Sequence, residues 1–235
     1  AVRVRLRLTN EPDDTPAGGR SKERTLAALQ GQRSSLGRWS RVLDLWCPAW
    51  FWENGPRPDR RTFAELAAHI FHGRSSLPER VLAPLAAHLE DVASRRAFLH
   101  WPIAFPELLS DERRGTGAGS GFDAIVGNPP WDMVRGDSGE AGVRAGRRAD
   151  AQRLTRFVRE SGIYRVETRA HVNRYQLFVE RALQLARPGG RIGLVLPSGV
   201  ASDAGAGALR RHLFDRADID EVTGHDNREG IFPIH

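Results

Sequence analysis

The sequence predicts an α/β fold whose N-terminal part forms a mainly helical lobe. Two short apolar runs, residues 122–126 and 192–196, are typical of parallel strands buried on both faces. A helical pattern separates the two runs, and this order predicts a βαβ unit with a right-handed crossover. Earlier residues repeat apolar side chains at helical spacing instead. We therefore expect a mainly helical lobe or insertion at residues 1–96 and a strand-containing domain at residues 97–235.

The composition is that of a globular protein with a basic balance. Of the 235 residues, 40% are hydrophobic and 27% are charged, which excludes a disordered chain. The formal net charge is +6, and a basic chain favours a polyanionic partner. Because Lys22 is the only lysine, the arginine bias favours a GC-rich genome over selection for phosphate contacts as its cause.

The cellular location is predicted from the cysteine content and from the absence of targeting patterns. Cys47 is the only cysteine, so we expect no internal disulfide and a reducing, cytoplasmic location. No stretch reaches the roughly 18 apolar residues of a membrane span, and no signal-peptide pattern opens the sequence. The sequence does not begin with Met and ends on an apolar segment, so we expect a piece of a longer polypeptide.

The lobe begins with residues 2–8, in which valine or leucine alternates with arginine. This alternation predicts a strand with a solvated or phosphate-binding arginine face. Thr62 and Glu65 have the spacing of a capping box for a helix that Gly73 ends, and Pro78 begins the next helix. A helix before these two has its apolar positions at Trp39, Val42, Leu43 and Trp46. The helix that Pro78 begins has them at Val81, Leu82, Leu85, Leu89 and Val92.

Two histidines of the lobe, His69 and His72, lie three residues apart. No cysteine or carboxylate completes a ligand set around them, so the sequence predicts no metal site.

Two segments join the lobe to the first strand run. Residues 98–109 are rich in aromatic residues and proline and predict a strand and turn, with Glu107 facing solvent or capping. Residues 113–121 are rich in glycine, but a cofactor loop has to follow a strand and open a helix. This segment follows charged residues and precedes a strand, so we expect a flexible connector.

Residues 121–131 organise the second domain, because the strand stops there in a stiff turn. Pro129 keeps Asn128 out of the helical region, and neither Pro129 nor Pro130 has an N–H group. The Asn128 side-chain oxygen and the Pro129 carbonyl are two acceptors at fixed spacing, which suits a planar amino group. Trp131 offers a flat face for stacking a ring. An exocyclic amine of a nucleobase meets both requirements, and chemistry on it requires the base to leave the duplex stack.

Residues 132–150 hold almost no apolar side chains and are rich in glycine and arginine, so we expect a loop. One interpretation is that it orders over the substrate, with arginines directed at nucleic-acid phosphates. The other is a solvated loop, and the sequence leaves both open. The arginines concerned are Arg135, Arg144, Arg147 and Arg148.

The remaining elements follow the same patterns. A helix from Asn173 to about Ala186 connects the two strand runs, and the Pro-Gly-Gly of residues 188–190 ends it. Beyond the second run we expect a helix capped by Asp203, a short strand at residues 219–223, and the start of another at residues 232–235, where His235 is structural.

The Asn-Pro-Pro-Trp motif of residues 128–131 resembles that of S-adenosylmethionine-dependent N6-adenine DNA methyltransferases. Further stretches, residues 98–107, 175–183, 188–199 and 230–235, are similar to the large methylases of type IIG restriction–modification and BREX-type phage-defence systems. The resemblance covers roughly residues 98 to 235, and the combination of stretches in this order is more specific than the central motif.

The resemblance implies that residues 97–235 are the C-terminal part of a class I, Rossmann-like methyltransferase domain. The implied reaction transfers a methyl group from S-adenosylmethionine to the N6 of an adenine flipped out of double-stranded DNA. Asn128, Pro129, Pro130 and Trp131 are the implied catalytic residues. The expected partners are DNA and a fused or associated nuclease and target-recognition domain, with no membrane.

The family's glycine-rich cofactor loop should precede the motif, and residues 1–126 contain no match for it. Cofactor-binding residues therefore stay unassigned, and we expect the chain alone to be inactive. Related enzymes use the same motif on a protein glutamine amide or an RNA guanine amine, and a degenerate methylase fold can serve as a non-catalytic DNA-binding subunit. Trp131 and the flanking residues 100–107 favour DNA adenine.

Overall fold

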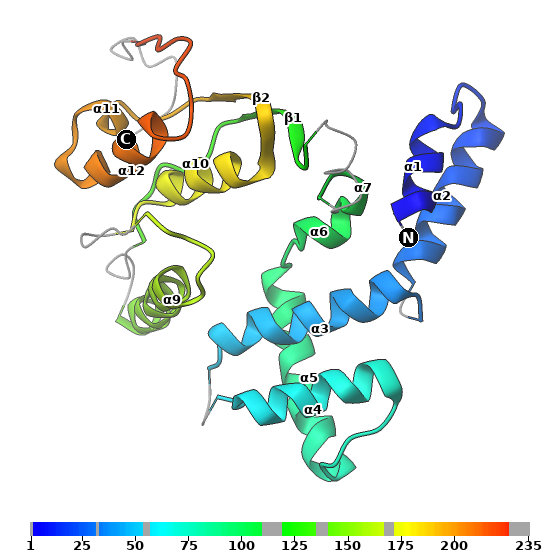
Figure 1. Ribbon diagram of the computed structural model, residues 1–235. Coiled ribbons are helices and arrows are strands. Elements are labelled where there is room, and N and C mark those ends of the chain that lie inside the picture. Colours follow the sequence, from blue (N-terminus) through cyan, green and yellow to red (C-terminus); the bar gives the residue numbers. More distant parts are fainter. Residues whose placement is uncertain are drawn as a thin grey trace. The chain divides into compact units, whose positions relative to one another are not determined.

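The computed structural model describes residues 2–31, 33–53, 57–109, 119–134, 141–166 and 172–225 (Figure 1). The chain divides into two compact units. The first contains Ala1–Asp123, Gln152–Phe157 and Arg187–Gly190, and the second contains Ala124–Ala151, Val158–Ala186 and Arg191–His235. The domain boundary that the sequence predicts near residue 96 stays a prediction.

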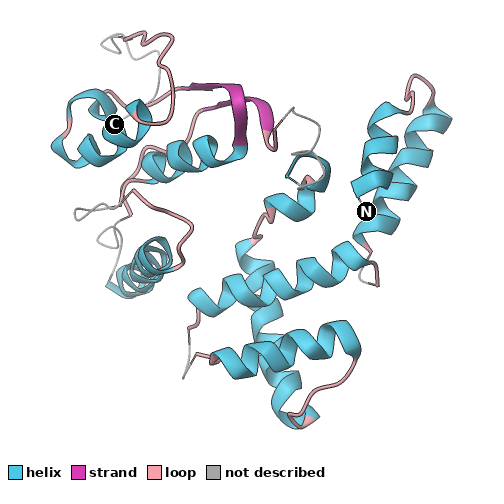
Figure 2. Cartoon of the chain, viewed as in Figure 1, coloured by secondary structure: helices cyan, strands magenta, loops and turns pink. Residues whose placement is uncertain are grey.

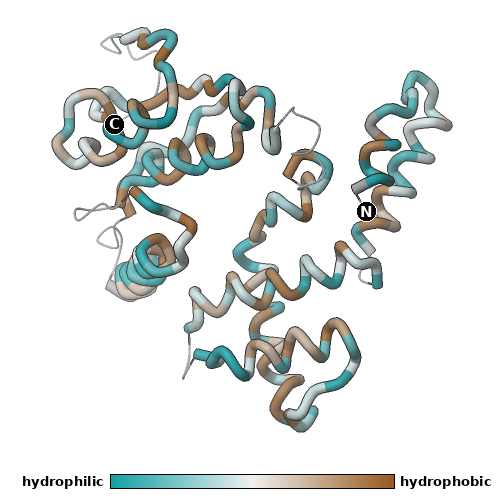
Figure 3. The backbone as a smooth tube through the Cα atoms, in the orientation of Figure 1, coloured by the Kyte–Doolittle hydropathy of each residue, from teal (hydrophilic) through white to brown (hydrophobic). Residues whose placement is uncertain are grey.

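The N-terminal part of the first unit is helical. Its helices are α1 (Val2–Asn10), α2 (Pro16–Gln30), α3 (Ser35–Trp50), α4 (Arg60–His72) and α5 (Glu79–Arg96). Leu45, Leu66, Leu82 and Leu89 form its core, each at most 2% exposed. Figure 3 shows brown hydrophobic segments recurring along α3, α4 and α5, as expected for amphipathic helices. The predicted helical patterns are confirmed, although Trp39 and Val81 are exposed rather than inward-facing.

The first residues form α1, so the strand predicted at residues 2–8 is wrong. Val4, Arg5 and Leu8 are the half-buried positions of this segment, and they share one helical face. Arg5 Nε and Nη2 donate to the Glu107 carboxylate at 3.0 and 2.9 Å. A strand would place Arg5 on the opposite face from Val4 and Leu8. The Glu107 side chain is only 12% exposed, so the expected solvent-facing position is also wrong.

Helix α4 begins at a different cap from the predicted one. Asp59 is the N-cap residue, and its Oδ1 accepts a hydrogen bond from the N–H of Thr62 at 2.7 Å. The Glu65 carboxylate instead accepts three hydrogen bonds of 2.6 Å from Ser75 and Ser76, beyond the end of the helix. These bonds lower the pKa of Glu65 to about 2. The capping box predicted for Thr62 and Glu65 is therefore wrong.

The ends of α4 and α5 follow the sequence more closely. Gly73 ends α4 with a φ of +66°, and Pro78 is the N-cap residue of α5, as predicted. Helix α5 ends at Ala97, whose φ of 49° is uncommon for a residue with a Cβ atom.

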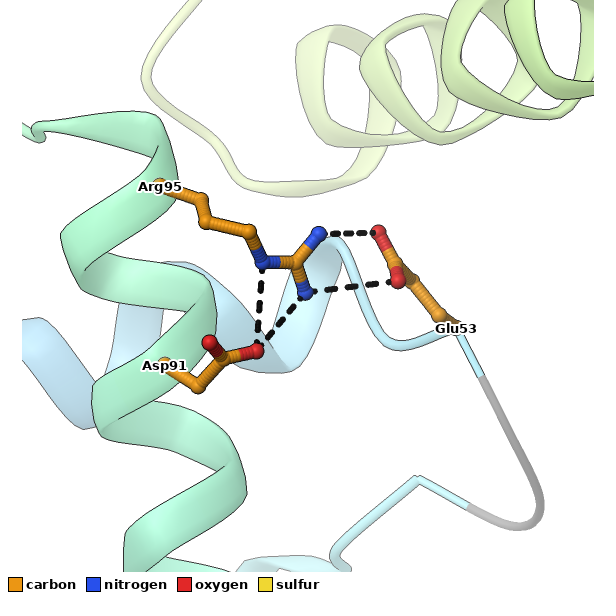
Figure 4. A network of polar contacts seen from close by, with 3 residues as sticks. All are labelled: Glu53, Asp91 and Arg95. Carbon is orange, nitrogen blue, oxygen red and sulfur yellow. Dashed lines mark hydrogen bonds and ion pairs between the residues drawn. The ribbon is translucent and has the colours of Figure 1, made fainter.

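Arg95, in the last turn of α5, lies between two carboxylates (Figure 4). Its Nε donates to Asp91 Oδ2 at 3.1 Å, and its two terminal nitrogens donate to the Glu53 carboxylate at 3.4 Å each. This network joins the segment after α3 to α5.

Residues 98–109 contain two short helices where the sequence predicts a strand and turn. They are α6 (Trp101–Ala104) and α7 (Pro106–Leu109), each with a proline in its first turn, where a missing N–H group is tolerated. The Trp101 and Phe105 rings stack with their centroids 5.8 Å apart. Both rings also pack against Phe122, at 5.7 and 5.2 Å, and anchor the first residue of the first strand.

The described residues contain one two-stranded sheet, formed by β1 (Phe122–Gly127) and β2 (Ala186–Leu194) (Figure 2). The strands run parallel, because Gly190 lies beside the Phe122 carbonyl and the N–H of Val195 donates to the Gly127 carbonyl at 3.0 Å. A Cβ atom at Gly190 would lie 2.8 Å from that carbonyl, so only glycine fits there. Helix α10 (Arg174–Leu185) lies between the strands in sequence, as predicted. The handedness of the crossover stays a prediction.

The strands are not buried on both faces, which corrects the expectation for them. Val126 is 87% exposed, and Val195, directly after β2, is 48% exposed. Leu194 and Leu196 instead pack against the core of the second unit, which contains Tyr175, Val179 and Leu209. Alternate side chains of a strand point to opposite faces, and the core that contains Tyr175, Val179 and Leu209 covers the face that carries Leu194.

The other described elements are α9 (Ala141–Glu160), α11 (Gly199–Ser202), the short 3₁₀ helix η1 (Ala204–Ala206) and α12 (Gly207–Phe214). Asp203 is the N-cap residue of η1, but its side chain makes no capping hydrogen bond. Residues 219–223 form no strand, so that prediction is wrong, and Val222 is 81% exposed. The strand and the His235 role predicted at residues 232–235 lie outside the described residues. Among the described helices, none has the length and apolar character needed to span a membrane.

Candidate active site

The predicted site residues follow β1 directly and form neither helix nor strand. Pro129 is buried, Trp131 is half-buried, and Asn128 and Pro130 are exposed. The buried Pro129 ring anchors the turn, so the Asn128 side chain stays at the surface where the strand ends. Within the described part of the chain, the Asn128 amide makes no hydrogen bond. It is therefore available to a ligand.

Trp131 is fixed to the end of β2. Its indole Nε1–H donates to the Val195 carbonyl at 3.3 Å. The N–H of Val195 donates to the Gly127 carbonyl at 3.0 Å. Val195 therefore joins both the end of β1 and the tryptophan of the motif. We refer to residues 128–131 together with Val195 as the strand-end site.

The chain after Trp131 pairs with the residues that begin α10. Met133 and Asn173 form an isolated antiparallel bridge. The N–H of Val134 donates to the Val172 carbonyl at 2.9 Å, and Arg174 Nε lies 3.0 Å from Asp132 Oδ2. The segment between Val134 and Val172 therefore begins and ends at two stretches that pair with each other, residues 132–134 and 172–174.

Helix α10 supports the site from within the second unit. Its residues Tyr175 and Val179, each 3% exposed, share a core with Leu209 of α12. Leu194 and Leu196 pack against this core. The end of β2, which holds Trp131, is therefore fixed by apolar packing.

Glu180 is the charged side chain buried in this support, at 1% exposed. Its carboxylate accepts hydrogen bonds from the backbone N–H groups of Arg165 and Val166, at 2.6 and 3.3 Å. Gln184 Nε2 donates to the same carboxylate at 3.2 Å and to the Ile163 carbonyl at 2.8 Å. These contacts attach the segment that follows α9 to α10.

The sequence pattern did not reveal this polar cluster. The available signal was the recurrence of Gln176, Glu180 and Gln184 every fourth residue beside the apolar stripe of α10. Gln176 is 4% exposed, its amide donates to the Gly205 carbonyl at 3.4 Å, and its Oε1 has no partner among the described residues. Because Gln176 and Glu180 are buried, they position the backbone.

The arginines predicted after the motif lie on a helix rather than a loop. Residues 141–150 form the first half of α9, so the expected loop is wrong over this range. Arg144, Arg147 and Arg148 are exposed, and Arg135 lies outside the described residues. Arginine and alanine favour helices, and this propensity outweighed the lack of apolar residues.

The described residues provide neither a metal centre nor a cofactor cradle. No group of three His, Cys, Asp or Glu side chains with metal-binding geometry occurs among them. Burial and the neighbouring Asp44 raise the pKa of the Cys47 thiol to about 12, so it is not a nucleophile at neutral pH. The turns after β1 and β2 are not glycine-rich, and neither opens a helix of two turns. They do not fit the adenosyl group of a methyl donor.

The strand-end site can bind a planar amine through fixed acceptors. Two acceptors, the Asn128 amide oxygen and the Pro129 carbonyl, stand at the carboxyl end of β1 beside an indole whose N–H is already engaged by Val195. Carboxyl ends of parallel strands are where ligands bind in open α/β sheets. This arrangement suits orientation of an amino group and contains no acid or base.

Comparison with known proteins identifies a family. A family model described as the Eco57I restriction-modification methylase matches residues 59–232, which is more than half of the chain. No curated protein and no solved structure matches the chain.

Proposed function

The chain belongs to the Eco57I restriction-modification methylase family, which implies a DNA methyltransferase, and on this premise we propose that it methylates the N6 of adenine in duplex DNA. The proposal includes a Rossmann-like methyltransferase sheet to which β1 and β2 belong. It also places the protein in a restriction–modification or phage-defence system, with a nuclease and a target-recognition domain as partners. Methylases of this kind generally use S-adenosylmethionine.

The observation that carries the proposal is the strand-end site. An exposed Asn128 follows β1 directly, Pro129 anchors it, and Trp131 is held by Val195. The adenine amine is planar and carries two N–H donors, which match the Asn128 oxygen and the Pro129 carbonyl. The flipped base would stack on Trp131, and such stacking contributes about 1–3 kcal/mol per base.

The proposed role of these residues is orientation and electrostatics. A neutral aromatic amine is a weak nucleophile, because its lone pair is delocalised into the ring. Hydrogen bonds to Asn128 and Pro129 draw the two N–H groups toward tetrahedral geometry and localise the lone pair on N6. A methyl donor supplies an electrophilic methyl group when bound. The described residues do not form its binding loop, so the roles of Asn128 and Pro129 concern only the amine.

Asn128→Ala tests the proposal in the protein expressed from its complete reading frame. We expect kcat for methyl transfer to fall by about 100-fold or more, the effect of losing one preorganised polar contact. DNA affinity should change little, because Asn128 touches a single amine. The measurement is N6-methyladenine in the DNA of a host that lacks adenine methylation, quantified by mass spectrometry, together with the Kd for duplex DNA.

The matched control is Asn10→Ala, which makes the same chemical change at an exposed residue of α1. Methyladenine that is present in wild type and Asn10→Ala and absent in Asn128→Ala supports the proposal. Near-normal methylation by Asn128→Ala would exclude the proposed role. No methyladenine from the folded wild type would favour a protein or RNA amine as the substrate, or a non-catalytic DNA-binding subunit.

A further inference from the structure

We propose that one face of α9, formed by Arg144, Arg148 and Arg159 with Gln152 and Thr155, binds the phosphate backbone of duplex DNA. We call it the α9 face. The inference rests on the proposed function for its choice of DNA as the ligand. It adds a second contact surface, distinct from the strand-end site that binds the amine.

The spacing of these residues makes a continuous stripe. Successive members lie four, four, three and four residues apart, which keeps them on one side of an α-helix. From Arg144 to Arg159 the stripe is about 22 Å long at about 1.5 Å per residue. This length corresponds to about six base-pair steps of about 3.4 Å, so several phosphates can be reached at once.

The stripe faces solvent, and the opposite side of α9 is packed near the C-terminal end of the helix. Arg144, Arg148, Gln152 and Arg159 are all exposed. On the other side, the Phe157 ring packs against Trp46 and Trp50 with centroids 6.2 and 5.9 Å apart. Val158, which borders the stripe, is 5% exposed. Packing therefore fixes which way the helix faces.

Among the described residues, the three arginines of the stripe have no partner. No hydrogen bond or ion pair joins Arg144, Arg148 or Arg159 to any residue that the structure describes. A row of unneutralised guanidinium groups repels itself, and a ligand with regularly spaced anionic oxygens relieves the repulsion. Phosphate is the group that guanidinium binds in bidentate geometry.

The chemistry of the face favours nucleic acid over a lipid surface. A membrane-binding helix presents large apolar side chains beside its basic ones. On the described part of α9, no large hydrophobic side chain is exposed. The face carries only arginine, glutamine and threonine, all of which are common phosphate ligands.

The connectivity links the α9 face to the strand-end site. The chain leaves the site at Val134 and returns at Val172, where the two residues are hydrogen-bonded at 2.9 Å. After its C-terminal end, α9 is followed by Arg165 and Val166, whose backbone N–H groups donate to Glu180. The segment from Val134 to Val172, which contains α9, is therefore held by hydrogen bonds at its two ends and after α9. An enzyme that flips a base out of a duplex needs such backbone contacts to hold the duplex in register.

The test is the salt dependence of DNA binding by the protein expressed from its complete reading frame. The probe is a fluorescein-labelled duplex of about 30 base pairs, titrated in KCl between about 50 and 200 mM. Each phosphate contact contributes about 0.9 to the slope of log K against log salt concentration. For R144Q/R148Q we expect the slope to fall by about 1.8 and the affinity at low salt to fall about tenfold. R144K/R148K keeps the charges and should retain most of the slope.

The control is R20Q/R24Q. Arg20 and Arg24 are exposed on α2 with the same four-residue spacing, so this variant makes the same change in net charge elsewhere. The proposal predicts a wild-type slope for the control. Equal losses in both double variants would overturn it, because a general charge effect then explains binding. An unchanged slope in R144Q/R148Q, or tighter binding of duplex RNA than of duplex DNA, would also overturn it.

Methylation measured on the same preparations separates the two proposals. A reduced slope in R144Q/R148Q without any methyladenine from wild type supports the α9 face and contradicts the proposed reaction. Methyladenine from wild type with an unchanged slope in R144Q/R148Q contradicts the α9 face alone. Both sets of variants should keep the wild-type thermal midpoint, because glutamine is nearly as good a helix former as arginine.

Discussion

At the scale of single residues, Glu180 depends on its neighbours to offset the burial of its carboxylate. Its side chain is 1% exposed, and its lone pairs accept hydrogen bonds from the N–H groups of Arg165 and Val166 and from Gln184. Burying a carboxylate is unfavourable unless its acceptors are filled. In return, Glu180 satisfies two backbone donors that no helix or strand satisfies, because residues 163–166 have no regular structure.

Glu180→Ala should lower the free energy of unfolding by about 1–3 kcal/mol, because two buried N–H groups lose their acceptor. Urea unfolding measures the change, and hydrogen exchange should become faster at the Arg165 amide. Glu160→Ala is the control, since Glu160 is an exposed glutamate at the end of α9. Wild-type stability together with slow exchange at Arg165 in Glu180→Ala would contradict this role.

At the same scale, the sequence predicted the candidate site better than it predicted what holds the site. The position of Asn128 after a strand follows from local facts, namely an apolar run and two prolines. The hydrogen bond from Trp131 to Val195 joins residues 64 positions apart, and no local pattern encodes it. Glu180 was missed for a related reason, because a glutamate on a helix is usually exposed.

At the scale of secondary-structure elements, helices α4 and α5 have equivalent C-terminal ends. Both end in a left-handed residue, Gly73 with a φ of +66° and Ala97 with a φ of 49°. A Cβ atom in this conformation meets the following carbonyl oxygen, while glycine avoids the contact. A Cβ atom at Gly73 would meet nothing else within 4 Å, so the backbone conformation alone sets the effect there.

Ala97→Gly should therefore raise the free energy of unfolding by about 1 kcal/mol, and Gly73→Ala should lower it by a similar amount. Thermal unfolding of each variant against wild type measures both signs. The pair controls for itself, because the two substitutions are the reverse of each other at equivalent positions. A change of the same sign in both variants would show that local packing, and not the left-handed backbone, sets the effect.

Elements were predicted well where periodicity agreed with long-range packing and poorly where it did not. The apolar spacing of α3 and α5 gave helices with the expected buried residues Val42, Leu82, Leu89 and Val92. Residues 2–8 alternate as a strand does, yet the bidentate contact of Arg5 with Glu107 and the packing beside it belong to a helix. That partner lies 102 positions away, so the sequence pattern alone could not reveal it.

At the scale of the whole molecule, each of the two compact units has its own apolar core. Leu45, Leu66, Leu82 and Leu89 form the first, and Tyr175, Val179 and Leu209 form the second. The sequence predicted Leu82 and Leu89 from their helical period, but it did not single out Leu45, Tyr175 or Val179 as core residues. It did not predict that Gln152–Phe157 of α9 would belong to the first unit, because contacts such as that of Arg156 with the Trp50 carbonyl join residues 106 positions apart.

Separate cores predict that a cavity in one unit destabilises that unit alone. Leu66 is 2% exposed and Leu209 is fully buried, and a leucine-to-alanine change at such sites costs about 2–5 kcal/mol. In Leu66→Ala we expect faster hydrogen exchange in α4 and α5 with unchanged protection in α10 and α12. Leu209→Ala should show the reverse pattern, because regions with their own cores open as separate units. Each variant is the control for the other, since the chemical change is identical. If either substitution speeds exchange equally in all four helices, the chain unfolds as one cooperative body and the two cores are not independent.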